Sequence, residues 1–126
     1  MLQAKVWGIS LEIDDSDTKT LANLREREKR FQQISLSFYP QDMSQTFKVN
    51  LFVADEKNPL FLGDAPIDEM VTQILQSRGP SGPNSDYLFN LAQSMKCIGD
   101  EAYDDHLKDL ETAVKLKEKE IKQVVN

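Results

Sequence analysis

The stretch of sequence that decides the fold spans residues 58–92 and reads NPLFLGDAPIDEMVTQILQSRGPSGPNSDYLFNLA. Two clusters rich in proline and glycine, residues 58–66 and 79–84, each precede a segment with helical periodicity. Proline fixes φ and glycine tolerates positive φ, so such clusters are typical of rigid turns. Asp64 and Asn84 are the predicted capping residues of the two helices. We therefore expect two helices joined by a stiff loop.

The rest of the C-terminal half is also predicted to be helical. Apolar residues recur with helical spacing in residues 67–78 and 84–97, and Gly99 supplies a stop signal after the second segment. Residues 100–126 form a third, strongly charged segment whose apolar residues have heptad-like spacing that Lys117 interrupts. This pattern favours a solvated helix packed along one narrow seam over a true coiled coil.

In the N-terminal half, three segments alternate apolar and polar residues, a pattern typical of strands. They are residues 4–13, 33–39 and 46–54. A short polar connection separates the last two, which predicts an antiparallel hairpin. Between the first two strands, residues 14–17 offer several helix caps and residues 18–31 have a helical pattern.

The helix predicted over residues 18–31 carries a carboxylate on its apolar face. Leu21, Leu24 and Phe31 share this face, and Glu28 falls on it at the same spacing. A glutamate that faces inward can acquire a raised pKa and take part in proton transfer. The alternative is a helix end that turns outward and leaves Glu28 solvated beside its basic neighbours.

Composition limits the class of protein. The sequence has 126 residues, of which 40% are hydrophobic and 29% charged, as in one small globular domain. A net charge of −6 argues against binding to nucleic acid. No apolar run approaches the roughly 20 residues that span a membrane, and no secretion signal is present, so a cytoplasmic protein is expected.

Composition also limits the chemistry. The single cysteine and single histidine exclude the usual zinc site, so no metal is expected and carboxylates are the best candidates for catalysis. His106 lies in a strongly charged segment and is expected at the surface. Cys97 is expected to be a small buried side chain. No glycine-rich phosphate-binding loop occurs.

Several motifs occur in a characteristic order along the chain. They are VWGI at residues 6–9, REK at 27–29, FYP at 38–40, NPLFLGDAP at 58–66 and GPSGPNSDYLFNLA at 79–92. The order and the residues of these motifs resemble those of the ChaC family of glutathione-specific γ-glutamylcyclotransferases, most specifically in the last two motifs. The resemblance covers nearly the whole chain except the charged C-terminal tail.

The resemblance implies an α+β fold, in which antiparallel strands from part of a γ-glutamylcyclotransferase-like barrel precede C-terminal helices. Family members begin with a strand and a "YGSL" loop, and no such motif occurs here. We therefore expect residues 1–126 to be one ChaC-like domain that is truncated at its N-terminus. Self-association through uncovered strands is then possible.

The resemblance also implies a reaction, in which glutathione is converted to 5-oxoproline and Cys-Gly without a metal or a cofactor. The catalytic glutamate of the family's REK motif falls on Glu28, with Glu26 as the alternative because about one residue is deleted nearby. Tyr87 matches a family tyrosine close to the substrate; alternatively it packs against the 79–83 loop. Other interpretations of the chain are an inactive binding or interaction module and an incomplete gene product.

Overall fold

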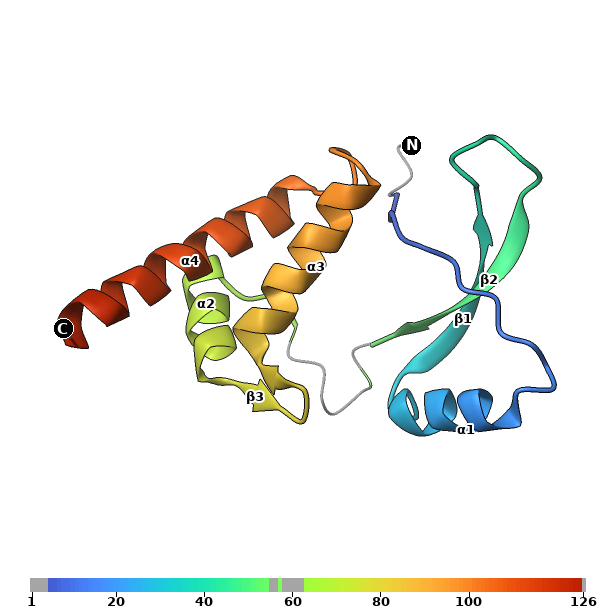
Figure 1. The fold of residues 1–126 in the computed structure, drawn as a ribbon, viewed down its shortest axis with the longest axis horizontal. Helices are drawn as coiled ribbons and strands as arrows, with labels where there is room; N and C mark the ends of the chain where they lie inside the picture. Colours follow the sequence, from blue (N-terminus) through green and yellow to red (C-terminus); the bar gives the residue numbers. More distant parts are fainter. Residues whose placement is uncertain (1–4, 55–56, 58–62, 126) are drawn as a thin grey trace. The chain divides into compact units, whose positions relative to one another are not determined.

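A computed structural model describes residues 5–54, 57 and 63–125 (Figure 1). The chain divides into two compact units: a hairpin unit, Ile9–Gly63, and a helical unit, Met1–Gly8 with Asp64–Asn126. Each unit is described by itself. In chain order the elements are α1 (Thr18–Arg27), β1 (Gln32–Phe38), β2 (Phe47–Val53), α2 (Ile67–Gln76), β3 (Arg78–Gly79), β4 (Gly82–Pro83), α3 (Asn84–Ile98) and α4 (Asp105–Val125).

The hairpin unit begins with helix α1, which is shorter than predicted. Asp17 caps the helix by accepting a hydrogen bond from the backbone N–H of Thr20 at 3.1 Å. The helix ends at Arg27, and the N–H of Phe31 donates to the carbonyl of Glu28 at 2.9 Å. This bond closes a tight turn that leads directly into β1, so Glu28 lies at the end of the helix and not within it.

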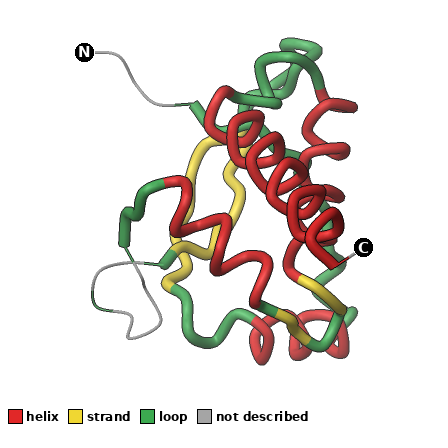
Figure 2. The backbone as a smooth tube through the Cα atoms, turned by 90° about the vertical axis from the view of Figure 1, so that its left-hand side faces the viewer, coloured by secondary structure: helices red, strands yellow, loops and turns green. Residues whose placement is uncertain are grey.

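Strands β1 and β2 form the predicted antiparallel hairpin (Figure 2, yellow). The register pairs Leu36 with Val49 and Phe38 with Phe47, so apolar residues meet on one face. The rings of Phe38 and Phe47 lie 5.1 Å apart between centroids. Because side chains alternate along a strand, the period-two pattern determined both the pairing and the composition of the two faces.

The strand predicted over residues 4–13 is wrong for the part that the structure describes. Residues 5–13 have no regular secondary structure, and the side chains of Ile9 and Leu11 are strongly exposed. A strand needs a partner for its backbone N–H and C=O groups, and no described residue pairs with this segment. The alternating pattern alone could not supply that partner.

The helical unit is built around contacts between α2, α3 and α4 (Figure 1). Val71 from α2, Leu88 from α3 and Val114 from α4 are buried against one another. The half-buried apolar residues packed around them are Ile67, Ile74, Leu75, Phe89, Leu107, Leu110 and Ala113. The narrow seam predicted for the last helix is therefore confirmed over its first half.

A short ladder of β3 and β4 connects α2 to α3, which confirms the predicted stiff loop. Gly79 pairs with Gly82, and the N–H of Asn84 donates to the carbonyl of Ser77 at 3.0 Å. Gly82 has φ +119°, a conformation that residues with a Cβ rarely adopt. The sequence of the loop, GPSGP, thus matches the backbone that it forms.

The two predicted caps of this region are wrong. The N-cap positions are Pro66 and Pro83, and neither helix has a side-chain capping bond. Both prolines have extended backbone (ψ 150° and 144°), so the helical conformation begins at the residue that follows each proline. Gly99 is confirmed as the end of α3, with φ +151°. Residues 58–62 of the first turn lie outside the described part of the chain.

The fold class is therefore mixed α+β, with small antiparallel sheets and C-terminal helices, as predicted. The described strands form two separate two-stranded ladders. A barrel is not seen among the described residues.

Candidate functional site

Glu28, the predicted catalytic residue, lies where α1 ends and the turn into β1 begins. Its side chain is 23% exposed, so the carboxylate is mostly covered while still open to solvent. Glu28 forms an ion pair with Arg27, whose Nε lies 3.7 Å from Oε1 of Glu28. Because the Arg27 side chain is largely exposed, water screens this ion pair and its contribution is small.

Glu26, the alternative candidate, has different surroundings. Its side chain is 74% exposed and forms an ion pair with Lys29 at 2.8 Å on the surface of the unit. Among the acidic residues that the structure describes in the hairpin unit, Glu28 alone is not classed as exposed. The two glutamates that the sequence left as alternatives therefore differ in exposure, and Glu28 is the more covered of the two.

Tyr87, the predicted substrate-binding residue, lies in the first turn of α3 in the helical unit. The residue is 66% exposed, so most of its surface is open to solvent. Glu28 and Tyr87 belong to different units.

The remaining sequence candidates have mixed outcomes. His106 is exposed, as predicted. The prediction of a buried Cys97 is wrong: the free thiol is exposed on α3, where Gln93 Nε2 lies 3.8 Å from Sγ. Within the described ranges, no three His, Cys, Asp or Glu side chains gather as a metal site would require.

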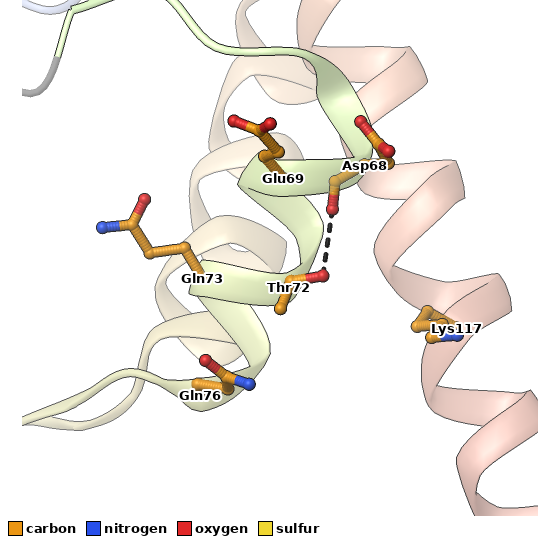
Figure 3. Close-up of a pocket in the computed structure, with 6 residues that line it drawn as sticks. All are labelled: Asp68, Glu69, Thr72, Gln73, Gln76 and Lys117. Atoms are coloured by element: carbon orange, nitrogen blue, oxygen red, sulfur yellow. Dashed lines mark hydrogen bonds between the residues drawn. The ribbon is translucent and has the colours of Figure 1, made fainter.

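The helical unit has an open polar pocket of about 540 Å³ between α2 and α4 (Figure 3). Thr72 in this pocket donates a hydrogen bond to the carbonyl of Asp68 at 3.1 Å. The pocket is lined by Asp68, Glu69, Thr72, Gln73, Gln76 and Lys117. It contains neither of the predicted site residues. Every residue that lines it is polar or charged, whereas small-molecule sites are lined mostly by hydrophobic and aromatic residues, so we do not assign it a function.

One polar cluster in the helical unit was missed by sequence reasoning. Glu111 on α4 is buried, and its carboxylate accepts a hydrogen bond from the hydroxyl of Tyr103. Lys96 Nζ lies 3.1 Å from Oε1 of Glu111, and Lys115 Nζ lies 3.4 Å from Oε2. The Lys96 ammonium also stacks 4.7 Å from the centre of the Tyr103 ring.

The charges of this cluster stabilise one another. Burial raises the pKa of Glu111, but hydrogen bonds from Tyr103, Lys96 and Lys115 outweigh burial and hold the pKa below its ordinary value. The hydrogen bond to Glu111 raises the pKa of both Lys96 and Tyr103. We interpret the cluster as a structural link between α3 and α4.

A sequence signal for Glu111 existed. It follows Leu107 by four residues and precedes Val114 by three, so it falls on the apolar stripe of α4. The same spacing rule singled out Glu28, and it applied equally well to Glu111.

Comparison with known proteins now adds to this geometry. The family model described as ChaC-like protein matches residues 2–117. The match covers most of the chain, so the chain belongs to the ChaC family.

Individual relatives agree with this assignment. The chain is 38% identical over 113 residues to glutathione-specific gamma-glutamylcyclotransferase 1 of Homo sapiens, a match covering 86% of this chain and 51% of the human protein. It is 35% identical over 117 residues to gamma-glutamylcyclotransferase 2-3 of Arabidopsis thaliana, covering 86% and 58% respectively. The chain thus spans about half the length of the curated relatives it matches.

A helix that crosses a lipid bilayer must be both long and apolar. In the part of the chain that the structure describes, no helix combines the length and the apolar composition needed to cross one.

Proposed function

We propose that the chain acts as a γ-glutamylcyclotransferase on glutathione, with Glu28 as the group that moves protons. The proposal is supported by membership of the ChaC family and by relatives whose names specify this activity. The observation that supports this choice of site is the position of Glu28. It is a partly covered carboxylate just before the hairpin, in the REK motif at residues 27–29.

The proposed chemistry needs one carboxylate and a folded substrate. The α-amine of the γ-glutamyl residue attacks its own side-chain amide carbonyl, a new C–N bond closes the five-membered ring, and the amide C–N bond to Cys-Gly breaks. Glu28 accepts a proton from the α-ammonium group and returns one to the leaving amine. Nucleophile and electrophile belong to one molecule, so holding the reactive conformer supplies much of the acceleration.

Tyr87 is proposed as a substrate-binding residue. Its exposed ring carries a hydroxyl that can donate or accept a hydrogen bond, and the first turn of α3 holds the backbone of this residue rigidly. We also propose that β1 and β2 contribute to a γ-glutamylcyclotransferase-type barrel in the complete family domain.

A second candidate function is an interaction module without catalysis. The observation that favours it is the uncovered apolar face of the hairpin, where Leu36 and Phe47 are each 46% exposed. The two candidates differ in a simple respect, because only the enzyme releases 5-oxoproline.

The test is incubation of the purified 126-residue chain with reduced glutathione, followed by assay of 5-oxoproline and Cys-Gly. We expect both products in equal amounts. Glu28→Gln should reduce turnover by about 10²–10⁴-fold, the usual contribution of a general acid–base group. The matched control is Glu26→Gln, which removes a carboxylate two residues away and should leave turnover unchanged.

Two results would contradict the proposal. One is the absence of both products from a folded sample, which would favour the interaction module. The other is unchanged turnover in Glu28→Gln, which would remove Glu28 from the mechanism while leaving the reaction assigned. Circular dichroism of each variant verifies that the helices remain folded.

A further inference from the structure

The helical unit has a second cavity, which differs in composition from the pocket between α2 and α4. Its volume is about 420 Å³, and small-molecule sites typically have volumes of roughly 300–1,000 Å³. Three parts of the unit line it: the N-terminal segment, the second half of α3 and the loop between α3 and α4. The N-terminal segment contributes Val6 and Trp7 of the VWGI motif, to which the proposed reaction gives no role.

More than half of the lining is apolar. It is made by Val6, Trp7, Met95 and Ala102. Ala102 is buried, and Trp7 and Met95 are half-buried. A turn bond fixes the loop that carries Ala102, because the N–H of this residue donates to the carbonyl of Gly99 at 3.1 Å. The indole ring of Trp7 is both an apolar surface and the aromatic ring that attracts cations most strongly.

Three charged side chains complete the lining: Lys5 from the N-terminal segment, and Glu101 and Asp104 from the loop. Oδ1 of Asp104 accepts a hydrogen bond from the N–H of Leu107 at 2.8 Å, so this carboxylate is held in place before α4. Lys5 and Glu101 are exposed, and within the described part of the chain neither forms an ion pair. Charges of both signs therefore line one cavity without pairing with each other.

This lining matches a ligand that carries both an ammonium and a carboxylate group. An extended dipeptide spans roughly 7 Å between its ends, which suits a cavity of this volume. The lining has two carboxylates and one ammonium group, so it favours a neutral zwitterion over an anion. An apolar floor with a few charged groups is also the usual composition of a small-molecule site.

We propose that this cavity binds a zwitterionic dipeptide. The ammonium group of the ligand pairs with Glu101 and Asp104, its carboxylate pairs with Lys5, and its backbone lies against Trp7. Cys-Gly, the dipeptide released in the proposed reaction, belongs to this class. Only that link rests on the proposed function, because binding requires no turnover and Glu28 belongs to the other unit.

The first test is titration of the 126-residue chain with Gly-Gly and with Cys-Gly, followed by tryptophan fluorescence and by calorimetry. Trp7 is the only tryptophan in the sequence, so its emission reports on this cavity. We expect a saturable change in emission with both dipeptides. N-acetyl-Gly-Gly, which lacks the ammonium group, should bind at least about tenfold more weakly, because it loses charge-assisted hydrogen bonds to two carboxylates.

Substitutions assign the two charges of the ligand. Glu101→Gln should weaken binding of Gly-Gly by about three- to tenfold, the loss expected for a charged hydrogen bond that remains partly exposed. Asp100→Asn is the matched control: it removes an exposed carboxylate from the neighbouring residue, outside the lining, and should change affinity by less than about twofold. Asp104 is left intact because it also caps α4.

Lys5 is tested with a pair of ligands. Lys5→Gln should weaken binding of Gly-Gly by about three- to tenfold, since its carboxylate loses a charged partner. The same substitution should not weaken binding of Gly-Gly amide, which has no carboxylate. Equal losses for the two ligands would mean that Lys5 does not contact the carboxylate.

Three results would overturn the proposal: no saturable change with either dipeptide, equal affinity for N-acetyl-Gly-Gly, or calorimetric binding that Glu101→Gln does not weaken. The last result would place the dipeptide elsewhere. Dipeptide binding by a chain that releases no 5-oxoproline would uphold this site and count against the enzymatic proposal. Release of 5-oxoproline by a chain that binds no dipeptide would do the reverse.

Discussion

The helical unit and the hairpin unit differ in how they are stabilised. In the helical unit, Val71, Leu88 and Val114 are buried at the junction of three helices. In the hairpin unit, the described residues pair in the expected register but none is buried. Local sequence pattern is enough to specify a hairpin register, whereas stability requires apolar surface to be covered. The proposed catalytic residue, Glu28, belongs to the unit without a core.

The same contrast holds for the two glutamates that sequence spacing aligns with apolar helix faces. Glu111 is buried and interacts with Tyr103, Lys96 and Lys115. Glu28 lies at a helix end, partly exposed, beside one exposed arginine. A buried carboxylate with its hydrogen bonds satisfied is suited to holding helices together, whereas a partly covered one retains access to a substrate.

The largest expected effect comes from removing core volume in one unit and not in the other. Leu88→Ala should lower the free energy of unfolding of the helical unit by about 2–5 kcal/mol, because it leaves a cavity. Leu36→Ala removes the same atoms from an exposed site and should cost less than about 1 kcal/mol. Urea denaturation measures both, monitored by helical circular dichroism for Leu88→Ala and by hydrogen exchange of the β1 and β2 amides for Leu36→Ala. Equal losses would contradict the difference between the units.

A smaller effect is expected from the two glutamates. Glu111→Gln should destabilise the helical unit by about 1–3 kcal/mol, because it weakens charge-assisted hydrogen bonds in a buried site. Glu28→Gln should change stability by less than about 0.5 kcal/mol, because water screens its ion pair with the exposed Arg27. Thermal melts of both variants are the measurement. A larger loss for Glu28→Gln would mean that Glu28 has a structural role.

The β3–β4 ladder provides the next comparison. Gly82 has φ +119°, so Gly82→Ala should destabilise the helical unit by about 1–2 kcal/mol through backbone strain. Gly79→Ala is the control, since a Cβ there would meet nothing within 4 Å and its φ is not in the positive region. If the two variants melt at the same temperature, backbone strain at Gly82 is not significant.

The smallest expected effect is on pH dependence. The pKa of Glu111 is lowered in the folded protein, so its contribution to stability is complete above the ordinary value of 4.5 and decreases as pH falls through the folded value. Wild-type chain should therefore lose part of the stability of its helical unit in acid, and Glu111→Gln should lose less. If wild-type chain and Glu111→Gln lose the same stability as pH falls, the cluster contributes nothing to the pH dependence of stability.

Sequence reasoning recovered the parts of the fold that depend on periodicity. The hairpin followed from alternation around Leu36 and Val49, and the three C-terminal helices followed from helical spacing. Boundaries were less accurate: α1 ends at Arg27 because the chain turns between Glu28 and Phe31, and no residue in that turn is a strong helix breaker. The strand over residues 5–13 failed because pattern does not supply a partner.

For the candidate site, the sequence placed Glu28 on a helix face but could not choose between it and Glu26 from burial. That choice depends on where α1 ends and how its last side chains are covered, which is a tertiary property. The cluster at Glu111 could have been anticipated from its spacing to Leu107 and Val114. Its partners, however, come partly from another helix and from the loop before α4.

The most direct test of the difference between the units is amide hydrogen exchange on the isolated 126-residue chain. Amides in α2, α3 and the first half of α4 should exchange slowly, because opening them exposes the core around Val114. Amides in β1 and β2 should exchange much faster, since no residue of either strand is buried. Equal protection of the hairpin and the three helices would contradict this account, because it would mean that the hairpin is already stabilised without a partner.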